Sequence, residues 1–409
     1  MTVGHRPDDL RRRNRAMAIA AVRKLESASR TEIATATGLS PSTISAISSD
    51  LIAEGVLATG TVADAGHARR GRPQVGLVLE PRAASVVTLA LRLNALSSAL
   101  IDYRGQIIRA DTIRIPTGEM DGQALIKAAI RAIKQLNAGE ETPVMRIAIA
   151  VQGTTDAHRR AMLWSPITVA TDVDFALALE DEFRMPVTID NDCNMMAEAL
   201  RWRDPATYRD DFLAILLSDG IGMGLMMKGK LFTGGHSSGG EFGHMVVRPE
   251  GALCRCGRQG CVEAYAGNYA IWRAARGLPE TSKPEGDREP EDMLALARAA
   301  RRGDGPERAA FRAAGEAVGY GLGSLFALID AAPVAFIGPG AGALDLMEEP
   351  MRDAILKTAG GEHSQALSFA TFPEELPLIR QGSAMRALTA IDDMFAARGP
   401  VRERHRRSA

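Results

Sequence analysis

Three of the four cysteines of this 409-residue chain gather in one short segment behind a histidine. The segment Gly240–Glu263 reads GEFGHMVVRPEGALCRCGRQGCVE. Cys254, Cys256 and Cys261 follow His244 by ten, twelve and seventeen residues. Three thiolates and one imidazole complete the tetrahedral shell of a structural zinc ion, so the segment predicts one zinc per chain held by these four side chains.

Two glycines support this interpretation, because Gly257 and Gly260 allow the positive φ that a tight turn between metal ligands requires. The alternatives are buried free thiols or a surface disulfide. Disulfides belong to oxidising compartments and small secreted domains, whereas this chain is long and shows no apolar leader at its N-terminus. The sequence therefore favours a zinc site in a cytoplasmic protein.

The composition is that of a globular protein with a full core, since 46% of the residues are hydrophobic. Apolar runs such as Phe212–Leu217 are far shorter than the ~20 residues a bilayer needs, so no membrane association is expected. Charge is unevenly spread: the segment through Arg82 has 12 basic and 8 acidic residues, a net +4, and the remainder has 37 and 42, a net −5. A basic N-terminus favours a nucleic-acid-binding module on an acidic body.

The first sixty residues contain three short helical patterns and predict a helix-turn-helix. Ser29 with Glu32 forms a capping box that begins the second helix, and Gly38 suits its left-handed end. Ser40 then caps a third helix whose first residue is Pro41.

The faces of these helices follow from apolar spacing. On the first, about Arg13–Leu25, the expected core residues are Met17, Ala21, Val22 and Leu25. On the third they are Ile44, Ile47 and Leu51. The opposite face of the third helix is small and polar: Ser42, Thr43, Ser45, Ala46 and Ser49. Ser42, Thr43 and Ser45 lie toward its N-terminal end, the part that reaches base edges in the major groove, although a solvated helix in a protein-contact domain is the alternative.

Basic residues flank this module on both sides. The stretch Val56–Val62 suits the hairpin of a wing, and Arg69, Arg70 and Arg72 follow it in the sequence RRGRP. An RGRP core typically enters a narrow A·T minor groove, but it is also common in solvated linkers. Four arginines of the first helical pattern are expected to contact phosphates: Arg11, Arg12, Arg13 and Arg15.

Beyond residue 84 strands and helices alternate, which indicates an α/β fold. Strands are expected at residues 85–91, 97–103, around 106–115, 146–153, 186–190, 212–218 and 333–338, and helices at 122–136, 175–183 and 193–202. Three antiparallel strands followed by crossover units indicate the two-lobed ribonuclease-H-like plan of actin-like ATPases and sugar kinases. The expected domains are a winged helix-turn-helix (1–66), a basic linker (67–83), two lobes (84–210 and 211–397) and a basic tail (398–409).

The chain resembles the ROK family of bacterial sugar kinases and sugar-responsive repressors over nearly its whole length. The resemblance rests on the zinc segment, with its GE-x-GH followed by C-x-C-G-x-x-G-C-x-E, on IDNDCNMMAEAL at 189–200, on RRRNRAMAIAAVRKL near the N-terminus and on the GRP of the linker. It implies that a sugar is held at five matching positions: Asn191, Asp192, Glu241, His244 and Glu263. Asn191 and Asp192 also end an expected strand, where open α/β sheets bind ligands, although an acid at a helix N-terminus is the structural alternative for Asp192.

The nucleotide-binding positions depart from the kinase pattern that the resemblance implies. The first phosphate hairpin holds Arg92, Leu93 and Asn94 where kinases carry small residues, and the second reads Ser218-Asp219-Gly220 in place of Gly-Thr-Gly. Pro339 interrupts the glycine-rich segment that meets the nucleoside. Asp192 matches the catalytic base of the kinases.

These observations predict a sugar-responsive DNA-binding transcriptional regulator, a repressor of carbohydrate genes, without enzymatic activity. Its expected partners are a double-stranded DNA operator and a sugar or sugar-phosphate effector, and a homodimer or homotetramer is expected because helix-turn-helix modules act in pairs. The alternatives are an active sugar kinase with an attached DNA-binding domain and an orphan DNA-binding regulator that has lost its effector.

Overall fold

The computed structural model describes residues 7–61, 75–235, 237, 239–284, 288–361 and 367–398. The chain packs as two compact units. The first comprises Met1–Ile149, Phe175–Thr188 and Ala384–Ala409, and the second comprises Ala150–Asp174 and Ile189–Ser383. The predicted lobes 84–210 and 211–397 are continuous stretches of sequence, whereas the two units are each made of several stretches that pack together. The division into these lobes therefore stays a prediction.

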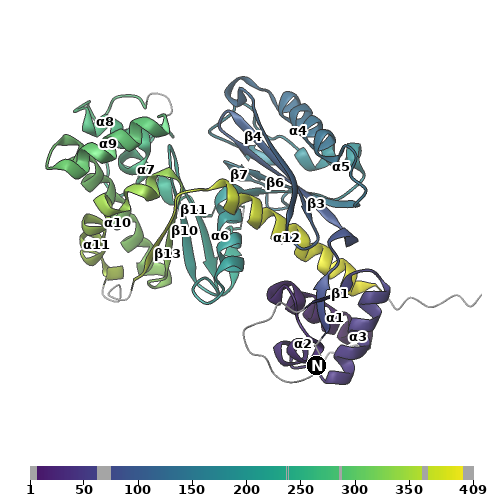
Figure 1. The fold of residues 1–409 in the computed structure, drawn as a ribbon. Helices are drawn as coiled ribbons and strands as arrows, with labels where there is room; N and C mark the ends of the chain where they lie inside the picture. Colours follow the sequence, from purple (N-terminus) through teal and green to yellow (C-terminus); the bar gives the residue numbers. More distant parts are fainter. Residues whose placement is uncertain are drawn as a thin grey trace, which may run out of the picture. The chain divides into compact units, whose positions relative to one another are not determined.

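The N-terminal module has three helices and a two-stranded antiparallel sheet (Figure 1). Its elements are α1 (Pro7–Leu25), α2 (Arg30–Thr37), α3 (Pro41–Ala53), β1 (Leu57–Thr61) and β2 (Val75–Leu79). The predicted caps are confirmed: Ser29 and Glu32 form a reciprocal capping box, Gly38 has φ of 69°, and the Ser40 side chain accepts the N–H of Thr43. Local sequence therefore fixes the turn between α2 and α3.

Two predictions for this module were wrong. The buried apolar residues of α1 are Ala18, Ile19 and Val22, whereas Leu25 is 42% exposed. The predicted face was displaced because two charged side chains of α1, Arg15 and Arg23, are also buried. The second correction concerns the linker 67–83, since residues 75–79 form β2 and pair with β1. The wing is thus a hairpin whose two strands lie on either side of residues 62–74.

The first large sheet has strand order β5-β4-β3-β6-β9. Its strands are β3 (Ser85–Arg92), β4 (Ala95–Asp102), β5 (Ile107–Arg114), β6 (Val144–Val151) and β9 (Val187–Asn191). As predicted, β3, β4 and β5 are antiparallel neighbours. The helices α4 (Gly122–Asn137) and α5 (Phe175–Phe183) lie where the sequence placed them. Residues 154–164 add the short hairpin β7 (Thr154–Thr155) and β8 (Met162–Trp164).

The second large sheet repeats this plan with strand order β12-β11-β10-β13-β14. Its strands are β10 (Phe212–Leu217), β11 (Ile221–Met227), β12 (Lys230–Phe232), β13 (Val334–Ile337) and β14 (Phe369–Phe372). β10, β11 and β12 are antiparallel, and β13 and β14 continue the sheet in parallel with β10. Two sheets that each begin with an antiparallel meander confirm the predicted two-sheet α/β plan.

Seven further helices accompany the second sheet or follow it in the part of the chain that is described. They are α6 (Asp192–Arg203), α7 (Glu263–Ala266), α8 (Asn268–Ala275), α9 (Pro290–Arg302), α10 (Pro306–Ile329), α11 (Leu344–Leu356) and α12 (Leu376–Ala397). Short 3-10 turns occur at Pro81–Ala83 (η1), Thr117–Glu119 (η2), Phe242–His244 (η3), Pro339–Ala343 (η4) and Ala359–Gly361 (η5). The apolar sides of β10, β11 and β13 pack with α10 and α11 in one continuous core. Within the described residues, no helix combines the length and the apolarity that crossing a bilayer requires.

The helix α6 lies directly against β11 because that strand lacks side chains at two positions (Figure 1). A Cβ on Gly222 would lie 2.5 Å from the Cys193 Sγ, and one on Gly224 would lie 2.3 Å from the Cys193 carbonyl oxygen. Larger residues would push the helix away from the sheet. The two glycines therefore fix the N-terminus of α6, which carries Asp192.

Candidate metal centre and ligand cavity

The four predicted metal ligands come together in the structure. One ligand atom from each of His244, Cys254, Cys256 and Cys261 lies within 4.8 Å of all the others. His244 ends the turn η3, and the loop that follows folds back so that the N–H of Cys254 donates to the carbonyl of Arg258 at 2.8 Å. The loop turns where Gly257 and Gly260 have φ of 84° and 80°, as the sequence predicted.

The spacing of these atoms fits zinc. At a Zn–S distance of ~2.3 Å, a tetrahedral ion separates two sulfurs by about 3.8 Å. The Sγ atoms of Cys256 and Cys261 are 3.8 Å apart, and the Cys254 Sγ lies 3.8 Å from the Nδ1 of His244. Nδ1 is therefore the ring nitrogen that faces the sulfurs, while Nε2 lies 3.9 Å from the carboxylate of Glu241.

The thiols of this cluster differ in acidity when no ion is bound. Burial and the neighbouring Glu263 raise the pKa of Cys254 well above its usual value, and burial beside Cys256 raises the pKa of Cys261 to about 11. Burial also opposes ionisation of Cys256, but hydrogen bonds from the Arg258 backbone and from Cys254 outweigh it and lower that pKa. A divalent cation would have to displace protons from at least the two more basic thiols.

A cavity of about 240 Å³ opens beside this cluster. All five residues predicted to bind a sugar line it: Asn191, Asp192, Glu241, His244 and Glu263. Its other polar lining includes Gln152, Thr154, Asn194, Ser237 and Arg255. Every one of these residues belongs to the second unit. The cavity thus combines carboxylates, amides and hydroxyls, the groups that hydrogen-bond a polyhydroxylated ligand.

Two of these residues begin α6. Asn191 caps the helix by accepting the N–H of Asn194 at 3.1 Å, and its amide donates to the carbonyl of Gly153 at 3.0 Å. Asp192 is 5% exposed and accepts the N–H of Cys193 at 2.8 Å. Burial, with Glu375 nearby, raises the pKa of Asp192 to about 7. Asn191 therefore has a structural role besides any binding role, and Asp192 is a carboxyl that titrates near neutrality.

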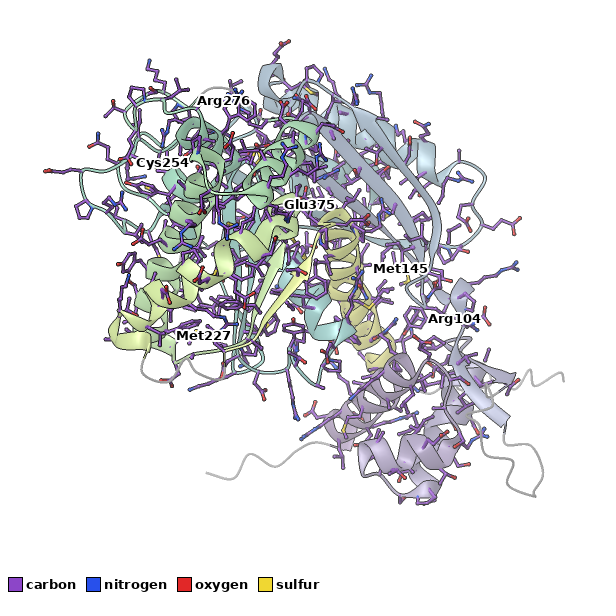
Figure 2. The ribbon with its side chains drawn as sticks, turned by 60° about the vertical axis from the view of Figure 1, so that its left-hand side comes forward. Arg104, Met145, Met227, Cys254, Arg276 and Glu375 are labelled. Carbon is purple, nitrogen blue, oxygen red and sulfur yellow. The ribbon has the colours of Figure 1, made fainter. Side chains whose placement is uncertain are left out.

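Glu263 connects the cavity to the metal cluster. Its side chain is 5% exposed, and one carboxylate oxygen accepts the N–H of Ile221 at 3.1 Å. The other oxygen lies 3.6 Å from the Cys254 Sγ and 3.5 Å from the Tyr269 hydroxyl. Burial and Glu263 raise the pKa of Tyr269, so this phenol keeps its proton and donates it. The position of Glu263 therefore depends on the loop that carries the metal ligands. Figure 2 marks Cys254 in this loop and Glu375 at the start of α12.

Several residues in and around the cavity were not predicted from the sequence. Tyr269 lies beneath the cluster, with the Arg255 guanidinium 4.8 Å from its ring centre. Trp164 lines the cavity from β8, and Arg159 forms an ion pair with Asp190, which precedes the two cap residues of α6. None of these positions has a motif or a periodic pattern around it, because each reaches the site through contacts between distant segments.

On α3, the helix whose polar face is predicted to contact DNA, the apolar and polar sides are buried and exposed largely as predicted. Ile44, Ile47 and Leu51 are buried, whereas Ser42 and Ser45 are exposed and Thr43 is half-buried. The hydroxyls of Ser42 and Thr43 lie 2.9 and 2.8 Å from that of Ser40, so both also belong to the helix cap.

The predicted arginines have different outcomes. Arg13 is exposed, and its phosphate contact stays a prediction. Arg15 is wholly buried and paired with Glu54, so that expectation was wrong for Arg15. Arg69, Arg70 and Arg72 lie outside the described residues.

The segments that match nucleotide-binding loops are shaped by close backbone contacts. A Cβ on Gly338 or on Gly340 would lie 2.9 Å from the carbonyl oxygen of Leu217, and the 3-10 turn η4 begins at Pro339. Asp219 accepts the backbone N–H of Arg288 at 3.2 Å. Both segments follow the carboxyl ends of β10 and β13.

Residues 93–372 match the ROK family, and the chain belongs to this family. It is similar to the xylose repressor of Bacillus subtilis, with 27% identity over 60% of this chain and 63% of that protein. It is also similar to the glucokinase of Halalkalibacterium halodurans, with 32% identity over 43% of this chain and 54% of that protein. The chain thus spans less than two thirds of the length of these relatives.

The fold has a full-length counterpart among solved structures. A ROK family transcriptional regulator, described as a homologue of the E. coli MLC protein, superposes with a TM-score of 0.75 at 22% identity. The match covers 94% of this chain and 99% of that one. The family region, residues 93–372, leaves out the first 92 residues. A match that covers 94% of the chain must therefore extend into the N-terminal module.

Proposed function

We propose that this protein is a transcriptional repressor that binds double-stranded operator DNA through its N-terminal module and responds to a sugar or sugar phosphate in the cavity. The proposal rests on the presence of two features in one chain. These are the exposed hydroxyl face of α3 and the cavity lined by carboxylates and amides. The xylose repressor and the ROK regulator to which it is similar support this combination. Such a protein works in the cytoplasm, and pairing of two modules on a pseudo-palindrome calls for a homodimer or homotetramer.

In this proposal Asn191, Asp192, Glu241, His244 and Glu263 hold the hydroxyls of the sugar. Ser42, Thr43 and Ser45 contact bases, while Arg13 and the arginines Arg69, Arg70 and Arg72 contact phosphates or the minor groove.

One structural zinc ion per chain completes the site. His244, Cys254, Cys256 and Cys261 would hold it, leaving no position open for a substrate. The bound ion supplies folding free energy to the loop. Its effect on the cavity is to hold Glu263, which lines the wall, through the contacts of Glu263 with Cys254 and Tyr269.

The helix α12 is our candidate for the link between cavity and DNA module. It begins one residue after Glu375, whose charge acts on Asp192. Its C-terminal half holds α1, because Asp392 binds Arg23 and the carbonyl of Phe395 accepts from Arg15. A continuous helix between two such sets of contacts is a physical route for coupling.

A glycine gives a test of this route. A Cβ on Gly382 would lie 1.8 Å from the carbonyl oxygen of Met195, so Gly382→Ala must move α12 away from α6. We expect this variant to bind operator without sugar as the wild type does, and to lose most of its response to sugar. An unchanged response in operator titrations would exclude α12 as the link.

Sugar kinase activity is the second candidate function, and Asp192 is the observation that favours it. A buried carboxyl with a pKa of about 7 is suited to accept the proton of an attacking hydroxyl. The nucleotide positions oppose it, because Asp219 places a carboxylate, and Pro339 a residue without an N–H, where kinases use bare backbone. We therefore assign no kinase activity.

The deciding experiment measures operator binding and phosphorylation with the same sugars. Fluorescence anisotropy of a labelled operator, with and without each sugar, is followed by incubation with ATP and magnesium. Sugar-dependent release of DNA without sugar phosphate supports the repressor. Turnover of ATP to a phosphorylated sugar would establish the kinase, and DNA binding insensitive to every ligand would leave an orphan regulator.

A further inference from the structure

An exposed tryptophan stands at the cavity among hydrogen-bonding groups. Trp164 lines the cavity and is 48% exposed. The other two tryptophans, Trp202 and Trp272, are half-buried and do not line the cavity. An open indole beside a ring of polar groups leaves apolar area that a ligand could cover.

The backbone of Trp164 is held firmly at this place. Trp164 pairs with Thr154 in the β7–β8 hairpin, and a Cβ on Gly153 would lie only 2.3 Å from the Trp164 carbonyl oxygen. The next residue, Ser165, donates its hydroxyl to the Gln152 carbonyl at 2.5 Å. The exposed ring is thus presented from a fixed strand.

The same hairpin is tied to the acidic part of the cavity. The amide of Asn191 donates to the Gly153 carbonyl, and Asn191 immediately precedes Asp192. Movement of the hairpin relative to the N-terminus of α6 would break this bond. The aromatic ring and the buried carboxyl are therefore positioned together in one rigid part of the second unit.

We propose that Trp164 is the wall against which the ring of the effector packs, and that the effector is an unphosphorylated pyranose. A pyranose has hydroxyls around its edge and a face of C–H groups, so it needs polar partners at the edge and an apolar surface under the face. Carboxylates and amides supply the first and the indole supplies the second. This inference rests on the proposed role of the cavity as the effector site and adds the chemical class.

The charges of the cavity argue against a phosphorylated sugar. Asp192, Glu241 and Glu263 line the same small space, and Arg255 is the cation among the lining residues that the structure describes. The Arg255 guanidinium already lies 4.8 Å from the ring centre of Tyr269. A dianionic phosphate would share about 240 Å³ with three acidic groups, which a neutral sugar avoids.

The test uses the full-length protein and two readouts. Calorimetry gives the affinity for glucose, xylose, N-acetylglucosamine, glucose 6-phosphate and the open-chain polyol sorbitol, and intrinsic tryptophan fluorescence reports contact with the indole. We expect at least one neutral pyranose to bind and change the fluorescence, with sorbitol and glucose 6-phosphate binding at least tenfold more weakly. Trp164→Ala should lose about tenfold in affinity, equivalent to ~1.4 kcal/mol. Trp164→Phe should retain affinity within about threefold and lose the fluorescence change.

Trp272→Phe is the matched control, because Trp272 packs with Arg276 and Arg288 away from the cavity lining. It should keep both affinity and fluorescence change. Thermal unfolding of Trp164→Ala within a few degrees of wild type shows that the fold is intact, and Trp164→Phe carries the test if it is not.

The outcomes separate this inference from the proposed function. If wild type binds a pyranose and both Trp164 variants bind it equally well with unchanged fluorescence, the aromatic wall is refuted while the effector cavity stands. Tighter binding of glucose 6-phosphate refutes the ligand class alone. If no sugar of the panel binds wild type, both the cavity's proposed role and this inference fail.

Discussion

Removing Asp392 should destabilise the first unit far more than removing an exposed partner of the same geometry. Asp392 accepts two bonds from the Arg23 guanidinium, at 2.8 and 2.7 Å, and one from the Tyr103 hydroxyl at 2.6 Å. The side chains of Arg23 and Asp392 are only 3% and 8% exposed. Burial opposes the charge of Arg23, but Asp392 outweighs it and raises the pKa of Arg23, so the guanidinium stays charged.

The magnitude follows from what is left behind. In Asp392→Ala the Arg23 guanidinium stays buried, with the Tyr103 carbonyl as its remaining acceptor at 2.8 Å. Leaving one charge of a buried pair uncompensated costs about 3–5 kcal/mol. Arg301 and Asp345 form an equally bidentate pair, at 2.8 and 2.6 Å, but their side chains are 39% and 56% exposed. Asp345→Ala should cost no more than about 1 kcal/mol.

Hydrogen exchange measures the loss of stability in α1 and α12 themselves, because it reports the opening of these helices separately from the second unit. We expect Asp392→Ala to lower the protection of both helices, and the double variant Arg23→Met/Asp392→Leu to recover most of it. Denaturant unfolding of the same proteins gives the total free energy. If Asp392→Ala and Asp345→Ala cost the same, the buried network does not anchor α1.

Three other predictions concern the metal, the buried carboxyl and the DNA contacts. Cys256→Ala should reduce bound zinc to well below one ion per chain in elemental analysis, and it should weaken sugar binding through Glu263. Unchanged sugar affinity in a zinc-free protein would disprove this link between the metal and the sugar. Asp192 keeps its proton in the folded state up to a pKa of about 7, so its contribution to stability is complete below pH ~4 and is lost as the pH rises through 7. Asp192→Asn should therefore gain stability relative to wild type between pH 4 and 8, by roughly 4 kcal/mol at most. If denaturation gave the same difference in unfolding free energy between variant and wild type at both ends of this pH range, the prediction would be contradicted. Arg72→Ala should weaken operator binding most on A·T-flanked duplexes and reduce the salt dependence by about one counterion. An equal loss of affinity on G·C-flanked duplexes would make Arg72 a plain phosphate contact. Thr43 variants should instead change base preference by roughly 1–3 kcal/mol.

The parts of the structure that local rules decide could be predicted from the sequence. The caps at Ser29 and Ser40 depend on residues within three positions, and the metal cluster depends on four residues within a short segment. Both were predicted at the right residues. Seven strands of the two large sheets were predicted, most of them because they are short apolar runs, whereas β11, β12 and β14 were not.

Features that depend on distant partners could not be found in this way. A helical pattern counts Arg15 and Arg23 as polar, so it assigns them to the surface. They are buried because Glu54 and Asp392 neutralise them from 39 and 369 positions away. The strand β2 was missed because its partner β1 lies beyond residues 62–74. Trp164 in the cavity and Tyr269 beside the cysteine cluster were missed because hairpin pairing and loop closure bring them to these places.

In the proposed function, the contacts of Glu263 couple metal binding to sugar binding. One of its oxygens is held by the N–H of Ile221 at the cavity, and the other lies against the metal ligand Cys254. A change at either side displaces the same carboxylate. Linkage requires that if the metal strengthens sugar binding by some factor, saturating sugar strengthens metal retention by that same factor. If that factor exceeds one, saturating sugar shifts the equilibrium with a chelator toward the zinc-bound protein, even though the sugar does not touch the ion.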